Sequence, residues 1–509
     1  MNIIKSTGTF SFFVLISRIL GYVRDFFIAL YLGSGPLADA FFVAFRIPNT
    51  FRRLFSEGTF NAAFVPSYSS ELIKGKDKAK EFANSVFNLL VFFLLVTTIL
   101  IEIFMPGFVK IIAPGFSDDK EKMQLAINLT RLTFPFLLFI CLASFLSAIL
   151  NSHNKFAAAA AAPIILNILL ILCLMFANKF GDTLVYYLSY TVSIAGLVQF
   201  IFLIFFVRKF YLPNFNLKIK MNDNIKIFFK KLLPSIFASG VTQINILVGT
   251  IIASFQASAV SYLYYADRIY QINLAIAGIA IGTVILPNLS KYVQTEDKLK
   301  ISEIQNKALE LSLFLSLPAS FALIVASEEI TSSLFGYGSF DIESVKNSAK
   351  ALFYFSLGLP AFSLIKIFSS FLFARNDTNT PFKISVLSVM VNILISVIFF
   401  NKIGFIIIPI ATTISSWLNG VILMIMVIKK SYFNFSSNFH FSILRILFSN
   451  FITLGIFIYL IKFFDKYLTY ESNYKFLFII ILVIITFIMY ILISIATRAF
   501  KISDIKIKY

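Results

Sequence analysis

The chain has 509 residues, of which 59% are hydrophobic and 14% charged, and its 44 Lys and Arg against 25 Asp and Glu give a formal net charge of +19. Soluble globular domains have an apolar share of about 45–50%, so this composition excludes that class. Long unbroken apolar runs such as residues 476–495 exclude a β-barrel, whose strands are alternating segments of about 10 residues. The composition therefore predicts an all-α polytopic membrane protein.

Hydrophobic segments recur along the whole chain. Most contain about 20 residues, which is enough to cross roughly 30 Å of hydrocarbon as a helix. In chain order they lie at residues 10–32, 37–56, 84–106, 126–150, 157–178, 183–207, 232–255, 259–287, 305–326, 350–373, 383–401, 404–428, 442–463 and 475–497. We therefore expect about fourteen transmembrane helices.

Basic residues gather in alternate loops. One side has the lysines of residues 74–80, the basic stretch 208–231, Lys429 and Lys430, and both basic termini, whereas the other has the uncharged turns 33–37 and 256–261 and the acidic stretch 327–349. Cytoplasmic loops carry the excess of Lys and Arg, so both termini are expected to be cytoplasmic. The positive charge reflects this topology and attraction to anionic headgroups, and the scattered lysines do not favour nucleic acid as a partner.

The first two hydrophobic segments carry an unusual number of ionisable side chains. A charge at bilayer depth costs at least about 2.5 kcal/mol, so such residues normally face a bundle interior or a water-filled path. They are Arg18, Arg24, Asp25, Asp39, Arg46, Arg52 and Arg53. The surplus is cationic, which predicts an intramembrane site for an anion.

Helical spacing sharpens this site. Asp39, Arg46 and Arg53 recur every seven residues and share one face of the second segment, with Asn49 between the two arginines. The planar fork of Arg suits bidentate recognition of phosphate or carboxylate. Phosphate-like chemistry is thus the expected ligand class.

An internal repeat with an offset of about 220 residues divides the chain. Residues 44–47 are echoed by 266–269, and residues 150–156 by the stretch that leads to Pro381, which predicts two six-helix lobes in a parallel repeat. The expected organisation is an N-terminal lobe at 1–207, a basic amphipathic linker at the cytoplasmic interface at 208–231, a C-terminal lobe at 232–428, and two further helices with a basic tail at 429–509. Arg268 is the repeat equivalent of Arg46, so cations from both lobes are expected around one cavity.

Structural interpretations of the same residues stay open. Arg52 and Arg53 could snorkel to the interface as positive-inside residues, and Arg24 with Asp25 could be a buried structural pair. His153 and His440 are expected to be solvated at loop ends. The sequence has no cluster of His, Cys or carboxylates with metal-ligand spacing, and Cys141 and Cys173 lie in apolar helices where no disulfide is expected.

Several motifs together resemble one known family. They read SRILGYVRD at residues 17–25, ADAFFVAFRIPN at 38–49, RRLFSEG at 52–58, FVP at 64–66, YYADR at 264–268 and FARNDT at 373–378, followed by Thr380 and Pro381. The chain closely resembles the MurJ (MviN) lipid II flippases of the MOP exporter superfamily. The resemblance extends over most of the chain, and the family's fourteen helices agree with the segments counted above.

The resemblance implies export of lipid II, an undecaprenyl-pyrophosphate-linked muropeptide, from the inner to the outer leaflet of the bacterial cytoplasmic membrane. It implies that Arg18, Arg24, Arg52 and Arg268 are cavity arginines for the pyrophosphate, that Asp39 is an important acid, and that there is no catalysis and no cofactor. Further expected partners are membrane lipids and the cell-wall synthesis machinery.

The chain departs from the family pattern at three positions. Gln271 and Asn273 stand where some members have Glu and many have Pro, and Gly249 offers no acid where some members bind sodium. Because Gly249 offers no acid and the expected cavity carries several arginines, coupling to membrane potential is the expected energy source in place of a bound sodium ion.

Two other functions are left open. A polysaccharide-lipid or drug exporter of the same superfamily would share the fold, but a cationic-drug antiporter would not favour an arginine cluster. An enzyme acting on polyprenyl phosphates would need a metal-binding carboxylate cluster or a general base on a cytoplasmic loop, and the loops have Lys runs and isolated acids.

Overall fold

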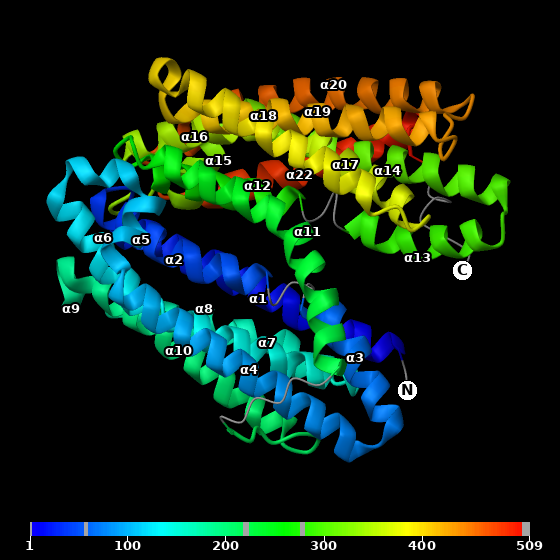
Figure 1. Cartoon of the computed structure of the whole chain (residues 1–509). Helices are drawn as coiled ribbons and strands as arrows, with labels where there is room; N and C mark the ends of the chain where they lie inside the picture. Colours follow the sequence, from blue (N-terminus) through cyan, green and yellow to red (C-terminus); the bar gives the residue numbers. More distant parts are fainter. Residues whose placement is uncertain (1–2, 55–59, 217–222, 275–279, 501–509) are drawn as a thin grey trace. The chain divides into compact units, whose positions relative to one another are not determined.

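The computed structural model describes residues 3–54, 60–216, 223–274 and 280–500 (Figure 1). Within these ranges every regular element is a helix, which confirms the all-α class. The contacts divide the chain into two compact units, Met1–Ser261 and Tyr262–Tyr509, and each is described by itself below.

Unit 1 is a bundle in which α1 packs on α8, α2 on α6, α10 on α7 and α8, and α11 on α3. Its α-helices are α1 (Ile3–Leu32), α2 (Pro36–Leu54), α3 (Phe60–Lys74), α4 (Lys76–Ile103), α5 (Met105–Ile112), α6 (Lys120–Thr133), α7 (Phe136–Ser152), α8 (Phe156–Met175), α9 (Ala177–Phe180), α10 (Leu184–Val207) and α11 (Asp223–Ala253). Short 3-10 turns η2 (Pro114–Asp118) and η3 (Gly181–Thr183) join some of them.

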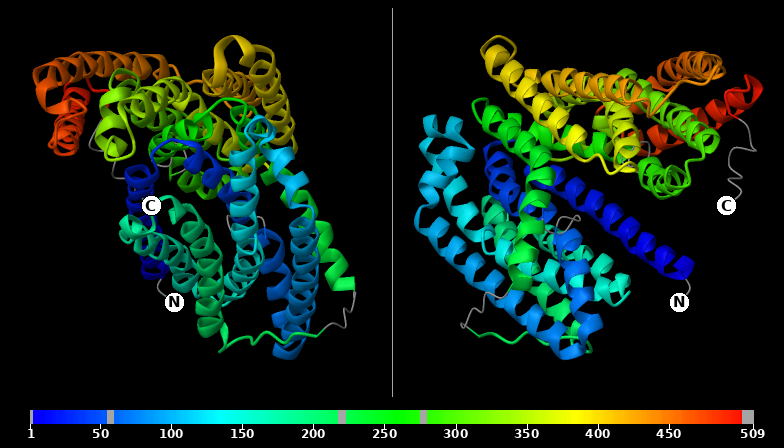
Figure 2. Two further views of the ribbon diagram at one scale, coloured as in Figure 1. Left: turned by 90° about the vertical axis from the view of Figure 1, so that its left-hand side faces the viewer. Right: turned by 45° about the vertical axis from the view of Figure 1, so that its right-hand side comes forward.

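Unit 2 begins within α12 (Ala259–Leu274). In it α18 packs on α19, α17 on α14 and α19, and α20 on α14 and α22; the pair α18 and α19 stays adjacent in the views of Figure 2. Its other helices are α13 (Ala280–Gln294), α14 (Lys298–Val325), α15 (Ser327–Phe335), α16 (Ile342–Leu357), α17 (Leu359–Phe373), α18 (Asn379–Ile403), η5 (Gly404–Ile406), α19 (Ile407–Lys429), α20 (Phe439–Phe463), α21 (Asp465–Leu468) and α22 (Lys475–Ala496).

Each of the fourteen hydrophobic segments overlaps at least one helix. In the described ranges, eight helical segments are long and apolar enough to cross a membrane, or nine if the bent pair α16 and α17 is one span. One of the eight runs from Asn379 to Lys429 and contains both α18 and α19, which pack against each other. A single crossing needs only about 20 residues, so this segment has the length of two. The chain is thus a multi-pass membrane protein, and the total of fourteen stays a prediction.

Two predicted segments are broken helices. Residues 126–150 fall on α6 and α7, which meet at Pro135, and residues 350–373 fall on α16 and α17, which meet at Gly358 and Pro360 with a 40° bend. Proline lacks the N–H that continues a helix, so both breaks have a local cause.

Local structures recur at the offset of the predicted repeat. Asp119 and Asp341, 222 residues apart, each cap a helix by accepting a hydrogen bond from the backbone N–H three residues on. Asn154 and Asn376, with the same separation, both have φ of 58° in the turn that precedes the next long helix. Such a backbone conformation is uncommon outside Gly and favours Asn, so its recurrence supports the repeat.

The segment between the predicted lobes differs from a separate interfacial helix. From Asp223 the chain is continuous helix to Ala253, and Phe228 and Leu232 in its first turns are buried. The Phe228 ring packs edge-to-face on Phe60 and Phe64 of α3, at centroid distances of 5.8 and 6.1 Å. Residues 217–222 of the predicted linker and 501–509 of the predicted basic tail lie outside the described ranges.

Candidate functional site: an arginine cluster in unit 1

Arg24 lies in a buried polar group between α1 and α8. Its Nε and Nη2 donate to Asp25 Oδ1 at 2.9 and 2.6 Å, and its Nη1 donates to Asn167 Oδ1 at 2.9 Å. The amide of Asn167 in turn donates to the Ser17 carbonyl at 3.0 Å, so Asn167 links α8 to α1 through the Arg24 guanidinium and through the Ser17 backbone. Arg24 is 6% exposed and Asp25 2% exposed. Arg24 and Asp25 thus form a buried ion pair in this structure, and a role of Arg24 in substrate binding stays a prediction.

A buried asparagine of α18 has different partners. Asn392 on α18 is also buried, but its amide donates to Thr412 Oγ1 at 3.1 Å and its carbonyl oxygen accepts from Ser396 Oγ at 3.2 Å. Neutral hydroxyls thus stand around Asn392 where Asn167 has an arginine.

The last turns of α2 carry three half-buried arginines. Arg46, Arg52 and Arg53 lie there, and Arg52 Nε donates to Asn49 Oδ1 at 3.0 Å, so Asn49 orients one guanidinium. Arg18 on α1 is exposed. Part of the motif that follows Arg53, residues 55–58, lies outside the described ranges.

Pro48 explains how this end of α2 is held. Proline has no N–H, so the Ala44 carbonyl one turn earlier loses its helical donor. Thr133 at the end of α6 supplies the missing bond, because its Oγ1 donates to the Ala44 carbonyl at 2.8 Å and is fully buried. The contact docks α2 on α6 beside the arginines.

Asp39, at the start of α2, is fully enclosed. Its carboxylate accepts from Lys122 Nζ at 2.7 Å, from the Ser258 N–H at 3.0 Å, and from the N–H and Oγ of Ser261 at 2.9 and 2.5 Å. Lys122 also lies over the Phe116 ring, 4.1 Å from its centroid. With four donors and no exposed surface, Asp39 in this conformation serves as a tether of α2 to α6 and to the start of α12.

Arg268 belongs to unit 2, where it contacts Tyr264 in two ways. Its Nη2 donates to the Tyr264 hydroxyl at 2.9 Å, and its guanidinium lies 4.8 Å from the Tyr264 ring centroid. The adjacent Asp267 accepts from Gln271, one of the positions that departs from the family pattern. Gln271 therefore donates a hydrogen bond to the Asp267 carboxylate within α12.

Two other sequence expectations can be placed. In the described part of the chain no group of three or more His, Cys, Asp or Glu could hold a metal ion, and Gly249 lies on α11.

The prediction that His153 is solvated is wrong: the ring stacks on Phe210 at 4.2 Å and its Nε2 is 3.2 Å from the Tyr68 hydroxyl. Burial, followed by the charge of Lys76, lowers the pKa of His153 below its usual value.

Sequence reasoning missed Lys122, Ser258, Ser261 and Thr133 as partners of the motif residues. The Pro48 within a predicted helix was the one usable signal, since it announces an unpaired carbonyl one turn back. The other partners are remote in sequence and have no distinctive pattern around them.

The helical fold of the described residues, with several segments long and apolar enough to cross a membrane, defines a multi-pass membrane protein. A MATE-family multidrug transporter in an inward-facing conformation matches it with a TM-score of 0.66 at 15% identity, over 81% of this chain and 94% of that chain, which concerns the fold alone. A family model described as lipid II flippase MurJ matches residues 28–482. The chain belongs to that family.

Individual proteins that are similar to this chain carry the same family description. Proteins described as probable lipid II flippase MurJ from Rhizobium tropici and Rickettsia prowazekii are each 39% identical, over 85% and 82% of this chain and 82% of each relative. Lipid II flippase MurJ of Burkholderia cenocepacia is 32% identical over 85% of both chains. A solved lipid II flippase MurJ in an inward closed conformation has a TM-score of 0.81 at 28% identity and covers 96% of this chain and 98% of that chain.

Proposed function

We propose that this protein flips lipid II, the polyprenyl-pyrophosphate-linked precursor of peptidoglycan, from the inner to the outer leaflet of the bacterial inner membrane. The observation that carries the proposal is membership of the MurJ family over nearly the whole chain, together with the arginines of α1 and α2 that the family motifs contain. Both termini are proposed to be cytoplasmic. The cell-wall synthesis machinery is proposed as a further partner.

The arginines are proposed to bind the pyrophosphate. Arg46, Arg52 and Arg53 are half-buried at the end of α2, and Asn49 already orients the fork of Arg52. A guanidinium can make two parallel charge-assisted bonds to a phosphate, and it stays protonated at bilayer depth. We assign Arg18, Arg24, Asp39 and Arg268 to the same function from the family motifs, with Asp25 as the counterion of Arg24 while no substrate is bound.

Transport then needs no covalent chemistry. The arginines replace the water around the pyrophosphate, and alternating access opens the site to one leaflet and then to the other. The polyprenyl tail stays in lipid throughout, along a path that we place beside α20 and α22, the two long helices outside the repeat. Because the site carries several arginines, reorientation of the empty carrier moves charge and should respond to membrane voltage.

Two alternatives receive less support. A MATE-type drug exporter shares the fold at 15% identity, but a cationic substrate would be repelled by the arginines of α2. An enzyme acting on polyprenyl phosphates would need a carboxylate or metal cluster, and the described residues contain no group of three such side chains.

Complementation tests the proposal. The chain is expressed in a bacterium depleted of its own lipid II flippase, and growth is compared for the wild type and for variants Arg24→Ala, Arg52→Ala and Arg268→Ala. Growth with the wild type and loss of growth with each variant at equal membrane level is expected. Arg208→Ala, which removes an exposed arginine after α10, is the matched control and should support growth. Failure of the wild type to support growth would contradict the function, and growth with all three variants would contradict the site.

A further inference from the structure

A charged cavity lies in unit 2 where α14 ends and α16 begins. It has a volume of ≈ 270 Å³ and is lined by Ser327, Glu328, Lys346, Ala349, Lys350, Phe353 and Tyr354. Ser327 and Glu328 directly follow the membrane-crossing α14, and Lys346 and Lys350 are the fifth and ninth of the 16 residues of α16, which forms a candidate membrane span together with α17. The cavity is therefore at a boundary between membrane and water.

The charges of this cavity are not paired with one another. Lys346, Lys350 and Glu328 are all exposed, and within the ranges that the structure describes none of them forms an ion pair. The two lysines are one helical turn apart, so their ammonium groups can converge on one anion. Glu328 supplies the opposite charge from α15. Two cations and one anion around a small cavity fit a zwitterionic ligand better than a simple anion.

The same face of α16 continues as an apolar surface that can face lipid. Phe353 and Leu357 follow Lys346 and Lys350 at helical spacing, and a helix rises about 1.5 Å per residue, so the aromatic ring lies roughly 10 Å below Lys346. Aromatic side chains at that depth are typical of the membrane interface. The polar layer thus passes directly into an apolar one.

Exposed apolar side chains of α19 extend this surface into the membrane. Trp417 Nε1 donates to the Leu357 carbonyl at 3.0 Å, and Thr413 Oγ1 donates to the Tyr354 carbonyl at 2.6 Å, so the two helices lie against each other at this depth. Beyond Trp417, Val421 and Ile425 are exposed on the same face of α19. A headgroup pocket continuous with an aliphatic stripe is the shape of a phospholipid site.

We propose that this cavity binds the headgroup of a membrane phospholipid that carries both a phosphate and a primary ammonium, an ethanolamine phospholipid. Lys346 and Lys350 bind the phosphate, the Ser327 hydroxyl donates to it, and Glu328 accepts from the ammonium. The acyl chains lie along Leu357, Trp417 and Val421. The site is separate from the proposed pyrophosphate site, because its residues are on α15 and α16 and include none of the family-motif arginines.

Native mass spectrometry of the full-length protein from mixed micelles tests the proposal. The protein is incubated with equal amounts of phosphatidylethanolamine, phosphatidylglycerol and phosphatidylcholine, and the retained lipid is measured. Preferential retention of phosphatidylethanolamine is expected, since phosphatidylglycerol has no ammonium and the trimethylated group of phosphatidylcholine has no N–H to donate. Equal retention of all three lipids would overturn the proposal.

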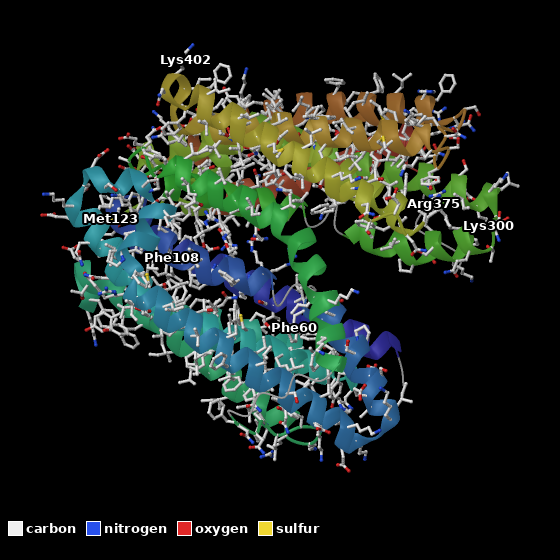
Figure 3. The ribbon with its side chains drawn as sticks, in the orientation of Figure 1. Phe60, Phe108, Met123, Lys300, Arg375 and Lys402 are labelled. Atoms are coloured by element: carbon white, nitrogen blue, oxygen red, sulfur yellow. The ribbon has the colours of Figure 1, made fainter. Side chains whose placement is uncertain are left out.

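Variants assign the preference to the cavity. The double variant Lys346→Gln with Lys350→Gln should lower retention about tenfold or more, and Glu328→Gln should remove the preference over phosphatidylglycerol. Lys402→Gln is the matched control, because Lys402 is exposed at the end of α18 and lies outside the cavity (Figure 3). Excess lipid II should leave the bound phospholipid in place. Displacement by lipid II, or unchanged retention in the double variant, would contradict the proposal.

Discussion

Replacing Lys122 by Met isolates the buried ion pair at the start of α2. Lys122 Nζ lies 2.7 Å from Asp39 Oδ2, with the lysine side chain 8% exposed and the carboxylate fully buried. Methionine has a similar length and leaves an apolar side chain beside the Phe116 ring, so the substitution removes the charge together with its contact to that ring.

The expected cost follows from what remains around Asp39. The Ser258 N–H and the N–H and Oγ of Ser261 still donate to the carboxylate, but these donors are neutral and the cation is lost. Leaving one member of a buried pair uncompensated costs about 3–5 kcal/mol. The three remaining hydrogen bonds place the expected value at the lower end, about 3 kcal/mol.

A double-mutant cycle supplies the assay. The free energy of unfolding in mixed micelles is measured for the wild type, Lys122→Met, Asp39→Asn and the double variant. We expect the double variant to be less destabilised than the sum of the two single variants, with a coupling energy of about 1–3 kcal/mol. Lys110→Met, at an exposed lysine of α5, is the control and should change stability by less than about 0.5 kcal/mol. Additive effects, or a Lys122→Met variant as stable as this control, would refute the reasoning.

Other regions of the chain give further predictions. Gly115→Ala should destabilise unit 1 by about 1–3 kcal/mol in the same assay, because an added Cβ would lie 2.4 Å from the backbone of Phe255; wild-type stability would show that this contact does not exist. The lowered pKa of His153 means that the unfolded chain binds the proton more readily than the folded chain, so the free energy of unfolding should rise with pH up to about 6.5 and fall as pH drops through the folded-state pKa. Unfolding measured between pH 5 and 7 should lose this pH dependence in the His153→Phe variant. An unchanged pH dependence in that variant would assign it to another group. A cysteine at exposed Ser339 should react with an impermeant reagent on intact cells and one at exposed Ser70 should not, with the reverse pattern overturning the proposed topology. Collapsing the membrane potential should stall lipid II in the inner leaflet, whereas exchange of sodium for potassium at fixed potential should change lipid II transport little. A strict sodium requirement at constant potential would contradict coupling to the membrane potential.

The sequence predicted the helices well because the apolar length that a membrane requires is a local property. Each of the fourteen hydrophobic segments overlaps at least one helix in the described ranges, and the breaks at Pro135 and Gly358 lie at or beside prolines that the sequence shows. Charge placement at membrane depth likewise made the arginines of α1 and α2 candidates for the site, and their function stays a prediction.

The partners of those residues could not be predicted in the same way. Asn167 is 143 residues from Arg24, and Lys122 is 83 residues from Asp39, so only the fold brings each pair together. Helical spacing placed Asp39 on one face with Arg46, but spacing alone gives no indication that other helices enclose one end of that face and leave the other half-exposed.

Lipid II exposure at the outer leaflet, measured with Arg52 variants at matched membrane level, tests the central claim most directly. The account predicts that Arg52→Ala abolishes exposure and that Arg52→Lys restores it only in part, because a point charge lacks the bidentate fork that suits a pyrophosphate and that Asn49 orients in the wild type. Exposure at the wild-type rate in both variants would contradict the account and would leave Arg52 as a snorkelling anchor of α2.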